Sequence, residues 1–156
     1  MKNRSKPSRI RERGQATVEF AFMVTFLLIL VVTFLEIVML GYTYVVLADS
    51  AKEGVRYAIV HGTGMSTCSG PGTAVTVPPI ACPDATGNNV KNAVTAKALY
   101  SLHSTATMAV TASYVDGSSA PPNRIRVTVS YPYQPFFGLG WPTVTVRAAA
   151  EGRIMF

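Results

Sequence analysis

The stretch RGQATVEF, residues 13–20, joins a basic segment to a long apolar one and decides how the chain is organised. Upstream, residues 1–14 carry six Lys or Arg side chains and one Glu, a net charge of +5. Downstream, no charged residue occurs between Glu19 and Glu36. The stretch is therefore a polar-to-apolar boundary, and the carboxylate of Glu19 lies just inside the apolar side.

The rest of the chain is almost neutral. The 156 residues have a formal net charge of +6, so residues 15–156 contribute only +1. Hydrophobic residues make up 49% and charged residues 14%, which is an apolar balance for a soluble protein. Nucleic-acid binding needs a basic stripe on a folded or arm-like element, so we do not expect it.

The apolar run fits a membrane-spanning helix. A bilayer core of about 30 Å needs about 20 helical residues, and we place the span at about residues 16–42. Positive charges before it favour a cytoplasmic N-terminus. In one register Glu36 lies near the outer interface; in the other it is submerged, with Tyr42 and Tyr44 in an outer aromatic belt. A secretory signal cut after Ala48 is a weaker alternative, because such signals have apolar regions of only about 7–15 residues.

The helix is expected to continue beyond the span, so that residues 15–61 form one long helix. Its charged residues make one polar stripe of two i, i+3 pairs: Asp49 with Lys52, and Glu53 with Arg56. The opposite stripe is apolar and either packs on the chain's own domain or serves neighbouring subunits: Leu47, Ala51, Val55 and Ala58. Gly62 and Gly64 then end the helix.

Residues 62–156 follow as a separate domain. Its first part, residues 62–87, is rich in Gly, Ser, Thr and Pro and is predicted to be a loop. Cys68 and Cys82 form a disulfide if this part faces an oxidising compartment. Two free thiols in a loop are the alternative.

Regular structure is predicted in the rest of this domain. A helix is expected over roughly residues 89–102, capped by Asn88 or Asn89. Alternating apolar residues predict three strands, beginning near Met108, Ile125 and Val144. The predicted fold class is therefore α+β: a long N-terminal transmembrane and amphipathic helix, then one helix and a three-stranded antiparallel sheet.

No catalytic constellation is recognised. The two histidines, His61 and His103, follow predicted helix ends and have no acid or nucleophile partner in a motif. We expect no enzyme activity, no cofactor and no metal site. In the loop at residues 136–141, the aromatic residues are expected to be buried anchors, and an exposed contact patch is the alternative: Phe136, Phe137 and Trp141.

Two motifs resemble the TadE-like family of pilus-assembly pseudopilins, from tight-adherence (Flp) pilus systems. The first covers residues 13–21, and the second, DSAKEGVRYA, covers residues 49–58 after the apolar run. The second motif has five hallmark residues: Lys52, Glu53, Gly54, Arg56 and Tyr57. Together the motifs extend over about a third of the chain.

The resemblance implies a cut by a prepilin peptidase between Gly14 and Gln15, at the cytoplasmic face of the membrane. Glu19 then becomes the fifth mature residue, the position at which pilins carry a glutamate. Phe20 stands where the major pilins have Tyr, and the chain is much longer than those pilins. Both features imply a minor pilin or pseudopilin with a pilin-like fold.

The chemistry of the boundary agrees with this interpretation. Cleavage would remove the basic leader, residues 1–14, and create an α-amino group at Gln15 that is largely cationic near neutral pH. Pairing that amine with Glu19 of a neighbouring subunit would offset the cost of burying the carboxylate among apolar helices.

The sequence therefore predicts a processed minor pilin that helps to assemble an adhesive Flp-type surface pilus. Its expected partners are the prepilin peptidase, other minor pilins, the major Flp pilin, the inner-membrane assembly platform and membrane lipid. We expect a single-pass protein of the bacterial inner membrane, with an extracytoplasmic C-terminal domain, or a subunit of the surface pilus. The alternative is an uncut membrane anchor whose outer domain binds a partner or ligand.

Overall fold

The computed structural model describes residues 9–76, 78–138 and 140–156, so most of the predicted leader lies outside the described residues. The elements follow in this order: α1 (Arg9–Val60), β1 (Thr73–Ala74), β2 (Ile80–Ala81), α2 (Asn88–Leu99), β3 (Ala109–Tyr114), β4 (Arg124–Tyr133) and β5 (Val144–Arg153). Two compact units divide the chain, one up to Val38 and the other from Met39 to Phe156.

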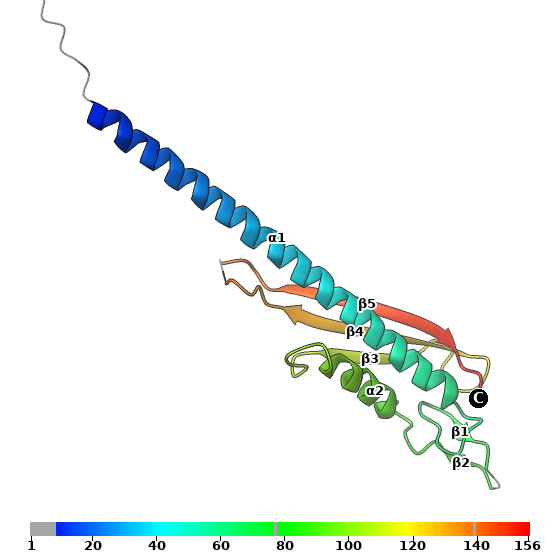
Figure 1. Ribbon diagram of the computed structural model, residues 1–156. Coiled ribbons are helices and arrows are strands. Elements are labelled where there is room, and N and C mark those ends of the chain that lie inside the picture. The colour runs from blue at the N-terminus through cyan, green and yellow to red at the C-terminus, as the bar shows by residue number, and fades with distance from the viewer. Residues whose placement is uncertain (1–8, 77, 139) are drawn as a thin grey trace, which may run out of the picture. The chain divides into compact units, whose positions relative to one another are not determined.

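The long helix α1 is continuous over 52 residues (Figure 1). It ends at Val60, one residue before the predicted end, but it begins at Arg9, where the sequence predicted no secondary structure. Arg and Glu have high helix propensity, and extending an existing helix needs no new nucleation. The Gly14–Gln15 peptide bond consequently lies inside the helix.

The three predicted strands form one antiparallel sheet in the order β3-β4-β5. In the central strand, Val127 pairs with Ala112 of β3 and with Ala150 of β5. The sheet and the two helices confirm the predicted α+β fold class. The sequence did not predict the small β1–β2 hairpin, in which Thr73 pairs with Ala81.

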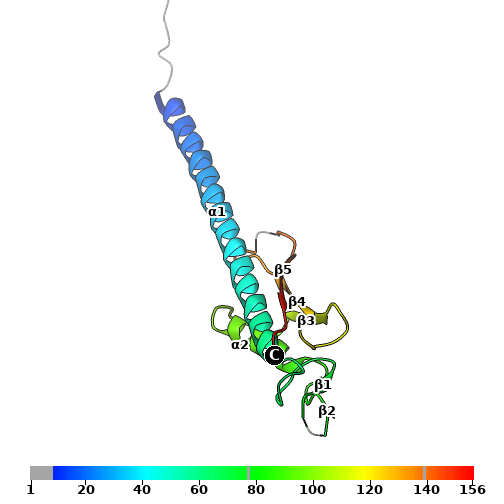
Figure 2. The ribbon, with the colours of Figure 1, turned by 90° about the vertical axis from the view of Figure 1, so that its right-hand side faces the viewer.

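The core lies between the helices and one face of the sheet. Alternate β4 residues are fully buried on that face: Ile125, Val127 and Val129. The end of α1 and all of α2 pack on them through apolar stripes: Leu47, Ala51, Val55, Ala58, Val90 and Val94. The last turns of α1 run along the sheet in both ribbon views (Figures 1 and 2). The amphipathic part of α1 therefore packs within its own chain.

The start of α2 differs from the prediction that Asn88 or Asn89 caps it. The cap position is Gly87, in the left-handed conformation with φ 66°, and it supplies no side chain. Instead the backbone N–H groups of Asn88 and Asn89 donate to the two carboxylate oxygens of Asp84, at 2.8 and 2.7 Å. A carboxylate satisfies these unpaired donors and also interacts favourably with the helix dipole.

Candidate functional site

The predicted cleavage site lies on the exposed first part of α1. The side-chain amide of Gln15 donates to Glu19 Oε1 at 3.2 Å, one helical turn away. Both side chains are exposed. In the uncut chain the carboxylate of Glu19 is therefore held by the same residue whose backbone nitrogen would become the new amine.

Gly14 has no packing role in the described structure. A Cβ atom built at this position would meet no heavy atom within 4 Å. Its φ angle is not among the positive values that favour glycine. Glycine in a helix interior costs about 1 kcal/mol relative to Ala, so a glycine at position 14 has no explanation in the fold.

The part of α1 that follows Glu19 presents large apolar side chains on all sides. Phe20, a predicted site residue, is 68% exposed, and Phe26 is 69% exposed. This region includes an 18-residue window with mean hydropathy 2.7, long and apolar enough to cross a membrane. Monomeric soluble proteins rarely expose such a continuous apolar surface, so this part of the helix needs an apolar environment.

Glu36 interrupts the apolar surface. Its side chain is only 4% exposed, whereas that of the adjacent Ile37 is 62% exposed. An ionisable group within an apolar span is costly in contact with lipid and usually faces away from it.

Gly54, the glycine of the second motif, is a packing residue. A Cβ atom built there would lie 3.3 Å from Val127 Cγ1 of β4 and closer still to Val94 Cγ2 of α2. The backbone of α1 therefore approaches both elements at this point, an approach that only glycine allows without displacement. The motif glycine thus fixes where α1 packs on the domain.

The charged residues of the second motif point to solvent. Lys52 pairs with Asp49 and Arg56 pairs with Glu53, each at 3.4 Å, which confirms the two predicted i, i+3 pairs. All four side chains are exposed, by 42% or more. Exposed pairs of this kind stabilise a fold by only about 0.2–1 kcal/mol, so these charges do little for the domain's own stability.

Tyr57, the last hallmark residue, orders the end of α1. Its ring stacks on that of His61, with centroids 4.0 Å apart and an interplanar angle of 8°. His61 Nδ1 lies 2.9 Å from the carbonyl oxygen of Tyr57, and the carbonyl of His61 accepts a bond from Ser69 N at 2.7 Å. His61 is therefore part of the junction between α1 and the following loop.

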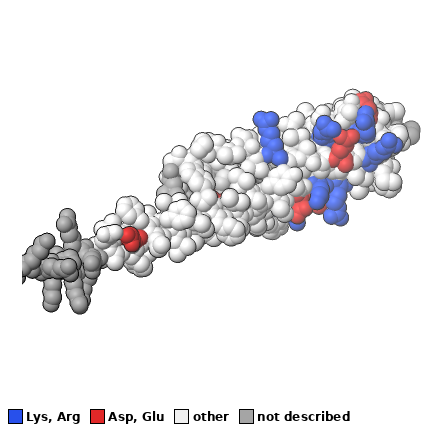
Figure 3. Space-filling view, turned by 90° about the horizontal axis from the view of Figure 1, so that it is seen from above, with Lys and Arg blue, Asp and Glu red and all other residues white. Residues whose placement is uncertain are grey.

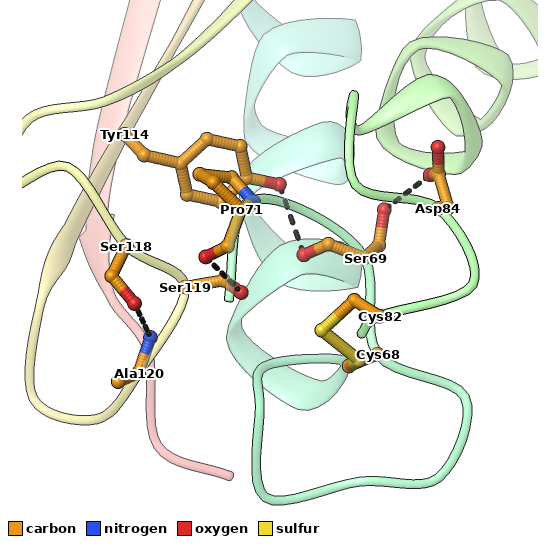
Figure 4. The surroundings of a disulfide bond; sticks show 9 residues. All are labelled: Cys68, Ser69, Pro71, Cys82, Asp84, Tyr114, Ser118, Ser119 and Ala120. Carbon is orange, nitrogen blue, oxygen red and sulfur yellow. Dashed lines mark hydrogen bonds between the residues drawn. A yellow bond between two sulfur atoms is a disulfide. The ribbon is translucent and has the colours of Figure 1, made fainter. Parts of the chain in front are cut away.

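That loop is held by the predicted disulfide and by several hydrogen bonds (Figure 4). Cys68 and Cys82 are bonded and buried, with Cα atoms 5.3 Å apart. Close to them, Ser69 donates to Asp84, and the Tyr114 hydroxyl donates to Ser69 O at 3.1 Å. The loop is consequently fastened both to the start of α2 and to β3.

The sequence interpretation missed these fastening residues. Asp84 had one usable signal, since an Asp shortly before a predicted helix is a strong capping candidate. Tyr114 had none, because its partner is a backbone carbonyl 45 positions away. Ser119, whose N–H donates to Pro71 O at 2.7 Å, is bound in the same non-local way.

The titratable groups around this loop, Asp84 and Tyr114, have structural roles. Partial burial favours a higher pKa for Asp84, but hydrogen bonds from Ser69, Asn89 and Asn88 outweigh it and lower the pKa below its usual value. The ionised carboxylate of Asp84 therefore stabilises the fold. This stabilisation is complete above the pKa that Asp84 has in the unfolded chain, and it is lost as the pH falls through the lower pKa of the folded chain. Burial raises the pKa of Tyr114 to about 12. Neither group titrates near neutral pH, where a general acid or base works best.

The aromatic loop corrects one prediction. Phe136, Phe137 and Trp141 are 78%, 42% and 43% exposed, so the expectation of buried anchors is wrong. The last buried side chain of β4 is Tyr133, and none of the described residues between it and Val146 belongs to the core cluster. The aromatic side chains therefore follow the last buried position of β4 and lie outside the core cluster.

The remaining candidates are His103 and possible clusters of metal-ligating side chains. Within the described ranges, no group of three or more His, Cys, Asp or Glu residues is placed to hold a metal ion. His103 is exposed and lines a hollow of about 370 Å³, together with Met39, Thr43 and Tyr133.

Taken together, the fold and the site define a class of protein: an α+β domain whose first helix begins as a long, exposed apolar segment. The family model of TadE-like proteins matches residues 14–56. The chain therefore carries a TadE-like segment, the family that its two motifs indicated. This segment begins at the predicted cleavage site and ends at Arg56, inside the second motif. No curated protein and no solved structure matches the chain.

Proposed function

We propose that this chain is a minor pilin or pseudopilin of a Flp-type (tight-adherence) pilus system, cut by a prepilin peptidase between Gly14 and Gln15. The observation that carries the proposal is the match of residues 14–56 to TadE-like proteins. That segment contains both the candidate cut and the exposed apolar helix. The proposed role is structural, in pilus assembly, and not enzymatic, because TadE-like proteins have a structural role.

The contrast between two glycines supports the processing step. Gly54 is needed for the packing of α1, whereas Gly14 touches nothing within 4 Å of its missing Cβ. A peptidase that recognises a small residue before the cut would account for a glycine that the fold does not need. Cleavage there removes six positive charges that otherwise hold the leader on the cytoplasmic side.

The bond between Gln15 and Glu19 supports the assembly step. A carboxylate among apolar helices needs a partner, and in the uncut chain the side-chain amide of Gln15 supplies one. The amine created by cleavage is a stronger, cationic partner. Offered to Glu19 of a neighbouring subunit, it would couple processing to the association of apolar helices.

The proposed location is the inner membrane, with the domain of residues 62–156 outside the cytoplasm. The Cys68–Cys82 disulfide supports this placement, because disulfides persist in oxidising compartments. The proposed partners are the prepilin peptidase, other minor pilins, the major Flp pilin and the inner-membrane assembly platform. The exposed charged pairs of the second motif are available to such partners.

The mass of the mature N-terminus tests the proposal. Co-expression with a prepilin peptidase should yield a chain that begins at Gln15. Gly14→Val should leave the leader in place, because a branched side chain at the residue before the cut obstructs the peptidase. Gly41→Val is the matched control, since Gly41 is also a helix glycine with open space around it, and this variant should be cut normally. An intact leader on the unmodified chain would overturn the proposal.

The assembly step has its own test. Glu19→Ala should insert into the membrane and lose its leader, yet fail to co-purify with the pilus complex. Glu19→Gln should behave in the same way, because a neutral amide cannot form an ion pair with the amine. Normal incorporation of both variants would contradict the pairing of Glu19 with the Gln15 amine, but it would not contradict cleavage after Gly14.

A second candidate is an uncut anchor whose outer domain binds a ligand. It is favoured by the hollow of about 370 Å³ beside His103, a size within the range of about 300–1,000 Å³ for ligand pockets. The same mass measurement separates the two candidates, because this one requires residues 1–14 to remain.

A further inference from the structure

One end of the domain is largely apolar. No charged residue occurs between Arg126 and Arg147, a stretch that includes the loop from β4 to β5. The loop exposes three aromatic side chains, and Phe136 packs edge-on against Phe137 with ring centroids 5.2 Å apart. An exposed cluster of this kind is a candidate interaction surface.

The start of this loop lies beside the part of α1 at which the predicted span ends. The hollow near His103 is lined by Met39 and Thr43 of α1 and, from the loop, by Gln134 and Phe136. The predicted span ends at about residue 42. The aromatic loop therefore lies close to the level at which α1 leaves the bilayer.

The end of α2 belongs to the same region. A second hollow, of about 220 Å³, is lined by Tyr42 and Val45 of α1 together with Lys97 and Ser101. Between these last two residues, Leu99 and Tyr100 are exposed, Tyr100 by 89%. The end of α2, which carries these two exposed side chains, thus also lies beside the part of α1 near Tyr42.

The opposite end of the domain has the reverse character. The N–H of Met155 donates to Ile59 O at 3.1 Å, and Ile59 lies about 30 Å along the helix from Met39. Ion pairs gather toward this end on the outer face of the sheet, joining Arg124 to Asp116 at 3.0 Å and Arg126 to Glu151 at 2.8 Å. Figure 3 shows most of the charged side chains of the domain at its right-hand end.

We propose that the apolar end of the domain rests in the interfacial layer of the membrane. We call it the lipid-facing surface, and it consists of five residues: Leu99, Tyr100, Phe136, Phe137 and Trp141. The inference rests on the membrane span of the proposed function and adds a second point of attachment to it. It holds the domain against the leaflet from which α1 emerges until the subunit is drawn into an assembly.

The chemistry of the surface selects lipid as the occupant. Trp and Tyr concentrate at membrane interfaces, where an apolar ring and a polar atom both find partners. Lys97, next to this surface, can extend its ammonium group to lipid phosphates. The two hollows place the start of the aromatic loop and the end of α2 beside residues 39–45 of α1, where the predicted span ends. Interfacial depth is therefore the level expected for the surface that these segments carry.

The only tryptophan of the chain, Trp141, reports directly on this contact. The full chain is reconstituted into vesicles of phosphatidylethanolamine and phosphatidylglycerol. We expect a blue-shifted Trp141 emission, strong quenching by lipid that is spin-labelled near the headgroup, and weak quenching by aqueous acrylamide. Quenching by acrylamide with no quenching by the labelled lipid would overturn the inference.

Matched variants keep the test specific. Phe136→Asp combined with Phe137→Asp should abolish most of the lipid quenching of Trp141 and shift its emission to the red. Phe156→Asp places the same change on an exposed phenylalanine near the opposite end of the domain, and it should leave both signals unchanged. Equal loss in both proteins would contradict the inference.

Two further outcomes are distinguishable. Trp141 could also be shielded from acrylamide in a way that depends on the ratio of protein to lipid, with no quenching by labelled lipid. That result would assign the surface to contact with a second copy of the chain and would overturn the lipid contact. Release of the unmodified chain from the vesicles by alkaline extraction would overturn the membrane span as well. Retention of the chain with a solvent-exposed Trp141 would overturn the lipid-facing surface alone.

Discussion

The two parts of α1, up to Val38 and from Met39 onward, are suited to different surroundings. Up to Val38, nearly every large apolar side chain after Glu19 is exposed, whichever way it points. From Met39 onward, buried residues recur every three to four positions on one side: Thr43, Leu47, Ser50, Ala51, Gly54, Val55 and Ala58. The first part is adapted to an environment that the chain does not supply, and the second part is adapted to the chain's own domain.

The two parts also use side chains of the same kind differently. Leu28 and Leu47 belong to one continuous helix, yet Leu28 is 59% exposed and Leu47 is fully buried. Composition alone does not separate them. The pattern of polar residues does, because apart from Glu36 charges return to the sequence only from Asp49 onward.

The largest expected effect separates these two leucines. Leu47→Ala should lower the free energy of unfolding of the domain by about 2–5 kcal/mol, because it leaves a cavity in the core. Leu28→Ala should change it by less than about 0.5 kcal/mol. Chemical unfolding in detergent, followed by near-ultraviolet circular dichroism, measures both. Comparable losses of unfolding free energy in the two variants would show that the two parts of α1 do not differ in this way.

An intermediate effect is expected for the glycines of the second part. Gly54→Ala brings a methyl group against Val94 and Val127. Such overpacking costs about 1–3 kcal/mol and the better helix propensity of Ala returns about 1 kcal/mol, so we expect a net loss of up to about 2 kcal/mol. Gly41→Ala, where a Cβ meets open space, should be neutral or slightly stabilising. The same unfolding experiment applies, and a stabilised Gly54→Ala variant would show that α1 is not held closely at this point.

The smallest effect concerns the charged side of the second motif. Lys52→Ala and Arg56→Ala each remove one exposed ion pair, so each should change the unfolding free energy by less than about 1 kcal/mol. If these residues serve neighbouring subunits, both variants should instead reduce co-purification with pilus components. A large loss of unfolding free energy would instead show that the motif charges stabilise the domain itself.

Local patterns in the sequence predicted most of the architecture. The alternation around Val127 predicted the central strand, and the spacing of Asp49, Lys52, Glu53 and Arg56 predicted the polar stripe with its ion pairs. The two motifs located the TadE-like segment. Each of these signals depends on neighbours within a few residues, which sequence periodicity records directly.

The features that escaped prediction depend on distant contacts or on solvent. Tyr114 binds the backbone of Ser69, 45 positions away, because the folded loop brings the two residues together. Asp84 is the exception: its carboxylate replaces the expected Asn cap through a contact of only four positions, and an Asp before a helix is a local capping signal. The aromatic residues of the β4–β5 loop were expected inside, since aromatic side chains usually serve as buried anchors, but they are exposed to solvent. Depth in the fold is a tertiary property that a loop sequence does not encode locally.

The position of the Gly14–Gln15 bond within α1 has a kinetic consequence. A protease active site binds its substrate as an extended strand, so a bond inside a helix is accessible only while the surrounding turn is open. When opening is fast relative to cleavage, the rate follows the population of the open form. A glycine that destabilises the helical turn by about 1 kcal/mol relative to Ala raises that population about fivefold. By this route Gly14 would set how quickly a newly inserted subunit is released from its leader.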